Sequence, residues 1–88
     1  MYKLVNYMEI LVERMFDDAT NDLNICKCGR CRLDIKAIAL NELEPKYVVS
    51  QEGEVYVKLN MMRQQFRAGV LSAIVKGAII VRDNKHHE

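Results

Sequence analysis

The apolar residues of this 88-residue chain recur with helical spacing in three separate stretches. In residues 3–19 they return at steps of three and four, with acidic residues opposite, which predicts an amphipathic helix. A second helix is predicted over residues 31–44, ended by Pro45, because proline disfavours helical backbone at the residue before it. The third and longest is predicted over residues 60–81, with Asn60 as its N-cap.

Two short β-prone runs lie between the second and third predicted helices. Residues 47–49 and 55–57 flank a glycine-containing loop at 50–54, which predicts a β-hairpin that must lean on the helices. The expected fold is therefore mainly α with a minor β part: three helices, a β-hairpin between the second and third, and a cysteine knuckle between the first and second. One domain is expected over residues 1–82, followed by a polar tail at 83–88.

The second half of the last predicted helix is apolar on almost every side. From Val70 onward, only two polar side chains interrupt it, and one small domain cannot easily bury such a helix all round. Small residues along it would admit a second helix closely: Gly69, Ala73, Gly77 and Ala78. We expect a homodimer, since two-fold symmetry is the commonest oligomeric arrangement. The alternative is that the hairpin and first helix cover this surface.

All three cysteines of the chain fall within six residues, at Cys26, Cys28 and Cys31. This spacing brings three soft ligands within reach of one ion, and zinc prefers such thiolates in tetrahedral sites. Basic residues that would offset the thiolate charge are interleaved with them: Lys27, Arg30 and Arg32. We expect a structural zinc staple here; the alternative is three buried thiols without metal. Clustered cysteines without a signal-peptide pattern also favour a reduced, cytoplasmic compartment.

The sequence leaves the fourth metal ligand open. Asp34 follows Cys31 by one helical turn, so its carboxylate is one candidate. His86 or His87 in the tail is another, from the same chain or from a partner subunit. A water molecule is the third, and it would leave an exchangeable position.

Overall charge and motif content exclude several classes of function. Thirteen basic and twelve acidic residues nearly balance, which makes direct nucleic-acid binding unlikely, and no apolar run is long enough to span a membrane. No phosphate-binding loop, nucleophile elbow or histidine–glutamate pair is present, so we expect no enzymatic activity. Cationic residues near the hairpin and last helix could hold an anionic nucleotide, although a solvated polar face explains them equally: Lys58, Arg63 and Arg67.

One continuous motif resembles a known family. Cys26-x-Cys28-x-x-Cys31-x-x-Asp34-Ile35-x-Ala37-x-Ala39-Leu40-Asn41-x-Leu43-x-Pro45-x-Tyr47-Val48 is similar to the late competence development protein ComFB family. The similarity of pattern covers nearly the whole chain, and Glu44 stands where the family often has a second proline. The resemblance implies a small, mainly helical, dimeric zinc protein with Cys26, Cys28 and Cys31 as ligands. It also implies a receptor for cyclic dinucleotides such as cyclic di-GMP.

Three hypotheses of function follow. The first is a non-enzymatic regulatory homodimer, stapled by zinc and binding a cyclic dinucleotide or a protein partner. The second is a thiol or metal redox sensor, or an enzyme, with an open zinc position and reactive cysteines. The third is a DNA-uptake accessory protein, which the near-neutral charge disfavours.

Overall fold

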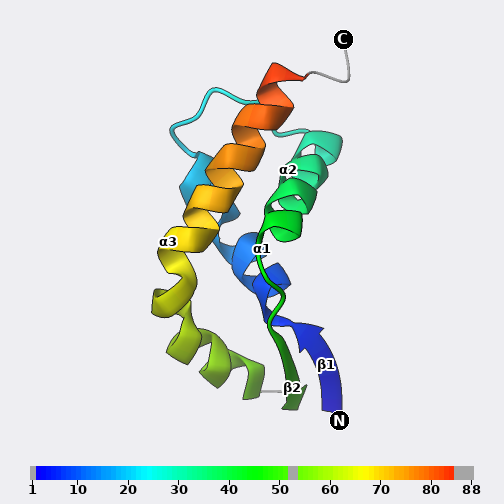
Figure 1. The fold of residues 1–88 in the computed structure, drawn as a ribbon, viewed down its shortest axis with the longest axis vertical. Coiled ribbons are helices and arrows are strands. Elements are labelled where there is room, and N and C mark those ends of the chain that lie inside the picture. Colours follow the sequence, from blue (N-terminus) through cyan, green and yellow to red (C-terminus); the bar gives the residue numbers. More distant parts are fainter. Residues whose placement is uncertain (1, 52–53, 85–88) are drawn as a thin grey trace.

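A computed structural model describes the backbone of residues 2–51 and 54–84, and the side chains of residues 2–49 and 66–84 (Figure 1). Its elements are, in order, β1 (Tyr2–Asn6), α1 (Tyr7–Thr20), α2 (Gly29–Glu42), β2 (Tyr47–Gln51) and α3 (Glu54–Asp83). The described part therefore has three helices and one antiparallel pair of strands, which confirms the mainly α class. The cysteines lie between α1 and α2, as predicted.

The strand between α2 and α3 forms as predicted, but its partner is different. β2 pairs with β1, in a register that places Leu4 opposite Val49 and Asn6 opposite Tyr47. The prediction that residues 55–57 form the second strand is wrong, because α3 begins at Glu54. Residues 47–49 thus pair with a strand some 40 positions earlier instead of a local one.

Asn6 explains why the first helix starts later than residue 3. Its Oδ1 accepts a hydrogen bond from the backbone N–H of Met8 at 3.1 Å, so Asn6 is the N-cap and α1 begins at Tyr7. The same oxygen accepts from the N–H of Lys46 at 3.1 Å, and the N–H of Tyr7 donates to the carbonyl of Lys46. One side chain thereby ends β1, starts α1 and fixes the approach to β2.

The other two helices also differ from prediction at their ends. α2 ends at Glu42, two residues early, and the N–H of Leu43 closes its last turn on the carbonyl of Ala39. α3 starts six residues before its predicted beginning, so Asn60 lies inside the helix and is not its cap. The β-branched residues of its first turns do not prevent this, since helix propensity is a weak bias that tertiary context overrides.

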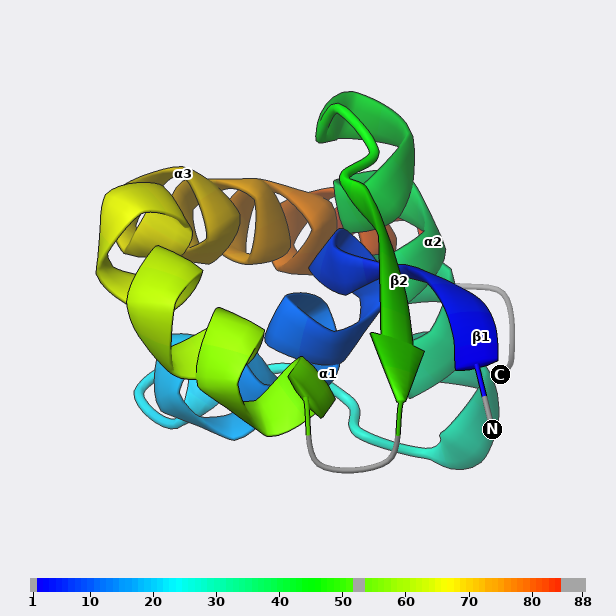
Figure 2. The same cartoon turned by 90° about the horizontal axis from the view of Figure 1, so that it is seen from below.

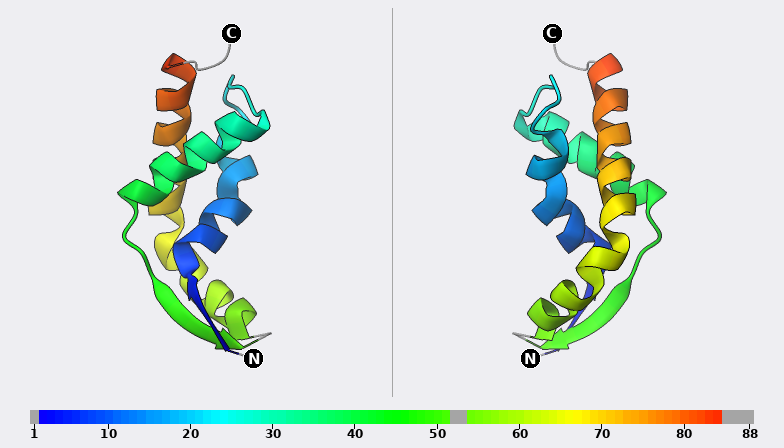
Figure 3. Two further views of the ribbon diagram at one scale, coloured as in Figure 1. Left: turned by 90° about the vertical axis from the view of Figure 1, so that its right-hand side faces the viewer. Right: turned by 90° about the vertical axis from the view of Figure 1, so that its left-hand side faces the viewer.

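The buried apolar residues form one cluster, to which the three helices that pack together in Figure 3 all contribute. α1 buries the apolar face that its periodicity predicted, with Leu11, Phe16 and Tyr7 fully inside. α2 and α3 complete the same cluster from the other sides, through Ile35, Ala39, Val70, Ile74 and Ala78. Because α2 and α3 pack through small residues, their axes approach closely.

Gly77 lies where these two helices are in close contact. A Cβ atom at this position would lie 3.0 Å from the carbonyl oxygen of Ile35 and 3.5 Å from the side chain of Ile38. Figure 3 shows α2, in green, crossing the orange half of α3 here. Gly77, like the buried Ala73 and Ala78, therefore serves packing within the chain, whereas a Cβ at Gly69 would meet nothing within 4 Å.

α3 links the two ends of an elongated molecule of 44 × 23 × 19 Å. It begins beside the strands at one end and finishes beside the loop that carries the cysteines at the other (Figure 1). On its outer face Ile79 and Ile80 are 37% and 42% exposed, whereas Val70, Ile74 and Ala78 are buried within the chain. Among the described residues, no helix combines the length and the apolar character needed to cross a membrane.

Candidate metal centre

The cysteine cluster is built by the loop after α1 and the first turn of α2. Cys28 is the N-cap of α2: its backbone is extended, and its Sγ accepts from the N–H of Cys31 at 3.5 Å. The carbonyl of Cys28 accepts from the N–H of Arg32 at 2.9 Å, which starts the helical ladder. Helix formation itself therefore places Cys28 and Cys31 one turn apart on the same side.

The three sulfur atoms converge on one point. All three Sγ atoms lie within 4.8 Å of one another, and no disulfide joins them. Tetrahedral zinc with bonds of about 2.3 Å separates its sulfur ligands by about 3.8 Å, so a contraction of about 1 Å completes the fit. Cys31 is buried, at 3% exposure, while Cys26 and Cys28 are exposed at the rim. The donor set and its geometry thus fit a zinc ion.

Hydrogen bonding and burial shift the pKa values of Cys28 and Cys31 in opposite directions. The hydrogen bond from the N–H of Cys31 is the main cause that lowers the pKa of Cys28 to about 7, helped by the thiols of Cys31 and Cys26. Burial is the main cause that raises the pKa of Cys31 to about 12, with Cys28 and Cys26 adding to it. A helix N-terminus favours a thiolate in the same way, so the Cys28 thiol is more ready than that of Cys31 to bind a cation.

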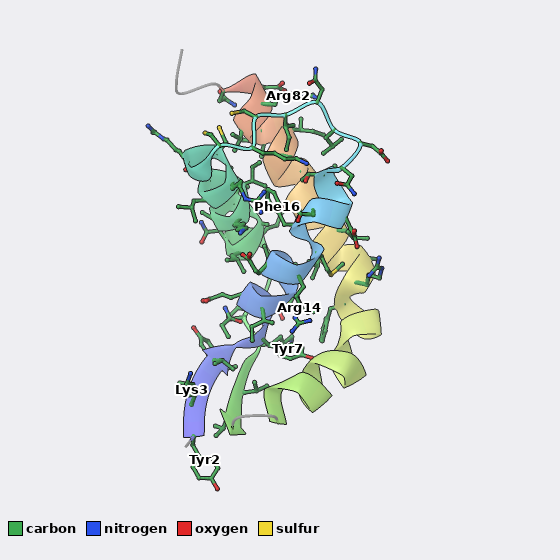
Figure 4. All side chains as sticks on the ribbon, turned by 180° about the vertical axis from the view of Figure 1, so that it is seen from behind. Tyr2, Lys3, Tyr7, Arg14, Phe16 and Arg82 are labelled. Atoms are coloured by element: carbon green, nitrogen blue, oxygen red, sulfur yellow. The ribbon has the colours of Figure 1, made fainter. Side chains whose placement is uncertain are left out.

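Contacts between α1 and α2 hold this helix start in place. The guanidinium of Arg32 lies 4.5 Å from the ring centre of Phe16, and the ammonium of Lys36 lies 5.3 Å from it (Figure 4). Both cations also reach carboxylates of α1: Arg32 pairs with Asp17 at 3.6 Å, and Lys36 pairs with Glu13. Exposed ion pairs contribute little individually, but a buried ring beneath them fixes their position.

A cavity of about 510 Å³ opens beside the cysteines. It lies between the loop, the start of α2 and the end of α3, and its lining is Asn24, Ile25, Cys26, Cys31, Ile35, Ala78, Val81 and Arg82. Figure 4 shows Arg82 at this end of the molecule, far from Tyr2. No local sequence pattern predicts this cavity, because it depends on where the end of α3 packs.

Of the candidate fourth ligands, the structure describes only Asp34. The Oδ2 atom of Asp34 lies 3.7 Å from Nε of Arg30, and among the described residues no carboxylate joins the three-sulfur group. His86 and His87 lie outside the described residues.

The predicted nucleotide-binding cations lie elsewhere. Arg67 is exposed on α3, with Arg63 one helical turn before it, whereas the side chains of Lys58 and Arg63 are outside the described set. Fourteen residues separate Arg67 from Val81 at the cysteine cavity, or about 21 Å of helix. The cations and the cysteines are therefore two separate candidate sites.

This arrangement defines a class: a small three-helix domain with a Cys-x-Cys-x-x-Cys cluster at the N-terminus of its second helix. Comparison with known proteins places it more narrowly. The chain belongs to the family described as late competence development protein ComFB, which it matches over residues 5–85.

Two relatives show how far the likeness extends. The chain is 28% identical over 82 residues to the competence protein ComFB of Bacillus subtilis (strain 168), covering 92% of this chain and 84% of the relative. A solved structure, described as the structural characterization of the late competence protein ComFB from Bacillus subtilis, superposes with a TM-score of 0.79. It is 27% identical, and the match covers 96% of each chain. Sequence and fold thus agree on the same family.

Proposed function

We propose that this protein is a non-enzymatic regulatory module in which Cys26, Cys28 and Cys31 hold a structural zinc ion. The observation that carries the proposal is the convergence of the three sulfur atoms within 4.8 Å at a helix start. Zinc bound there ties the loop after α1 to α2, and so supplies folding free energy to a domain with a small core. Lys27, Arg30 and Arg32 offset the negative charge of three thiolates.

The proposal includes a homodimer that binds an anionic signalling nucleotide of the cyclic dinucleotide type. Membership of the competence family and the exposed position of Arg67 on α3 support it. Arg63 lies four residues before Arg67, on the same face of α3. Two guanidinium groups at this spacing could each bind one phosphate. Lys58 belongs to the first turns of the same helix.

Metal content and mass test the first part together. Purified protein should contain one zinc ion per chain by elemental analysis, and light scattering on the same sample should give the mass of a dimer. Protein purified without chelators but free of metal would refute the staple.

Calorimetric titration with cyclic di-GMP tests the second part. Arg67→Ala should weaken binding by at least about tenfold, because a charge-assisted phosphate contact is lost. Arg82→Ala is the matched control, since it removes the same kind of side chain in the last turn of α3, about 15 residues from Arg67, and should leave the affinity unchanged. Equal affinities for all three proteins would place the nucleotide elsewhere, and absent binding by the wild type would refute the receptor role.

One observation favours a second function, a thiol redox sensor. Cys28 is exposed and its pKa lies near neutrality, which are the properties of reactive cysteines. The two functions differ in thiol accessibility: a closed zinc site keeps its metal and resists alkylation, whereas a sensor loses metal and reacts quickly. Thiol counting on the zinc-loaded protein separates them.

A further inference from the structure

The cavity beside the cysteines has an apolar floor that belongs to the packed core. Ile35 and Ala78 are fully buried, and Cys31 and Val81 are 3% and 6% exposed, so packing between α2 and α3 fixes these side chains. Its volume of about 510 Å³ falls within the range of about 300–1,000 Å³ that small-molecule sites occupy. The floor is therefore preformed and large enough for a small ligand.

Polar groups lie at the rim of this cavity. Asn24 and Cys26 are exposed, and the side chain of Arg82 is 43% exposed. Among the residues that the structure describes, the guanidinium of Arg82 contacts one charged group, through its Nε atom and Oδ1 of Asp83 at 3.3 Å. Such an exposed pair contributes little. Because a guanidinium carries five N–H donors, Arg82 retains donors for a ligand in the cavity.

The charges around the cavity favour a ligand with a single negative charge. Arg82 is the one cation that lines it in the described part of the chain, and a guanidinium pairs with a carboxylate through two parallel hydrogen bonds. Cys26 and Cys31 form another part of the wall, and three thiolates around a divalent ion leave a net negative charge there. That charge would repel a dianion such as phosphate more strongly than it would repel a carboxylate.

We propose that this cavity binds a small aliphatic carboxylate. Its hydrocarbon chain lies against Ile35, Ala78 and Val81, and its carboxylate pairs with Arg82 at the rim. An apolar enclosure with a few polar groups that fix the orientation of the ligand is the usual design of a small-molecule site. This site goes beyond the proposed function, because it is separate from the cations at Arg63 and Arg67 and needs neither the nucleotide nor a second subunit.

A chain-length series tests the apolar part of the site. The full zinc-loaded protein is titrated with butanoate, hexanoate and octanoate while its ¹³C-methyl NMR spectrum is recorded. Signals of Ile35 and Val81 should shift, whereas those of Val12, which is buried in α1 and does not line the cavity, should stay in place. Each step of two methylene groups should tighten binding on the order of tenfold, because both groups leave water.

Replacement of Arg82 tests the carboxylate contact. Arg82→Met keeps an apolar stem but removes the charge, so it should weaken hexanoate binding by at least about tenfold. Wild type should also prefer hexanoate to the neutral hexanamide by at least about tenfold, and the variant should lose this preference. Lys76→Met is the matched control, since Lys76 is a cation of α3 that pairs with Glu42 at 2.6 Å and does not line the cavity. It should bind hexanoate like wild type, with circular dichroism to confirm that both variants fold.

Each of the other outcomes overturns the inference in a different way. Octanoate that shifts neither Ile35 nor Val81 at millimolar concentration would refute the site. Equal affinity in wild type and Arg82→Met would refute the carboxylate as the group that the cavity recognises. Affinity that does not rise with chain length would show that the anion binds at the surface or at the metal, without the apolar floor. Elemental analysis of the same sample tests zinc binding separately, so its failure is distinguishable from failure of this site.

Discussion

Gly77→Ala tests whether the close crossing of α2 and α3 is a condition of stability. The added Cβ would lie 3.0 Å from the carbonyl oxygen of Ile35, which is backbone and cannot rotate away. The helices must then separate by a few tenths of an ångström. Such overpacking typically costs about 1–3 kcal/mol, whereas replacing glycine by alanine inside a helix gains about 1 kcal/mol. We expect a net loss of about 1 kcal/mol of unfolding free energy.

Gly69→Ala is the control, because it lies on the same helix where a Cβ meets nothing within 4 Å. It should gain the helix-propensity term alone, about 1 kcal/mol. The two variants should therefore differ by about 2 kcal/mol, or roughly 8–16 °C in melting temperature for a domain of this size.

Urea denaturation followed by circular dichroism, with zinc in excess throughout, measures the difference. Zinc must be held constant because bound metal adds to the apparent stability. If Gly77→Ala proves as stable as Gly69→Ala, α2 can move at no cost, and the crossing is not the tight contact described.

Three further predictions concern the cysteines and the junction at Asn6. Cys28→Ser should lower stability by several kilocalories per mole, because zinc affinity is lost. Chelation of zinc should bring the wild type to the same melting curve. An unchanged melting curve in the variant would show that Cys28 is not a ligand. In chelated protein, mass spectrometry should find Cys28 alkylated first, at a rate that rises with pH around a midpoint of about 7, while Cys31, with its pKa raised to about 12, reacts last. Faster reaction of Cys31 would contradict the burial described. Asn6→Ala should lower the unfolding free energy by about 1–2 kcal/mol, because it removes the acceptor for the N–H groups of Met8 and Lys46. Asn6→Asp keeps an acceptor and should retain most of this stability. Equal losses in the two variants would argue against the cap.

Local patterns were sufficient to predict the helices and the cysteine cluster. The buried face of α1 follows from side chains at steps of three and four, and the place of the cluster follows from six consecutive residues. These features depend on near neighbours in the chain, so a periodicity argument reaches them.

The strand pairing could not be predicted in the same way. The periodicity predicts residues 3–6 as part of the first helix, whereas they belong to β1, whose partner strand is distant in sequence. Residues 55–57 have the β-branched composition of a strand, yet they belong to α3. The cavity beside Cys26 and Cys31 also needs the end of α3, some fifty residues onward, so no local signal reveals it.

The distance in sequence between β1 and β2 has a consequence for the order of folding during synthesis. Tyr2 and its register partner Gln51 lie 49 positions apart, so at about 5–20 residues per second β1 emerges roughly 2–10 seconds before its partner is complete. α1 and α2 are both finished in that interval, and they contact each other directly. The nascent chain should therefore assemble from its middle outward, and its apolar N-terminal strand should be the substrate that a ribosome-associated chaperone encounters.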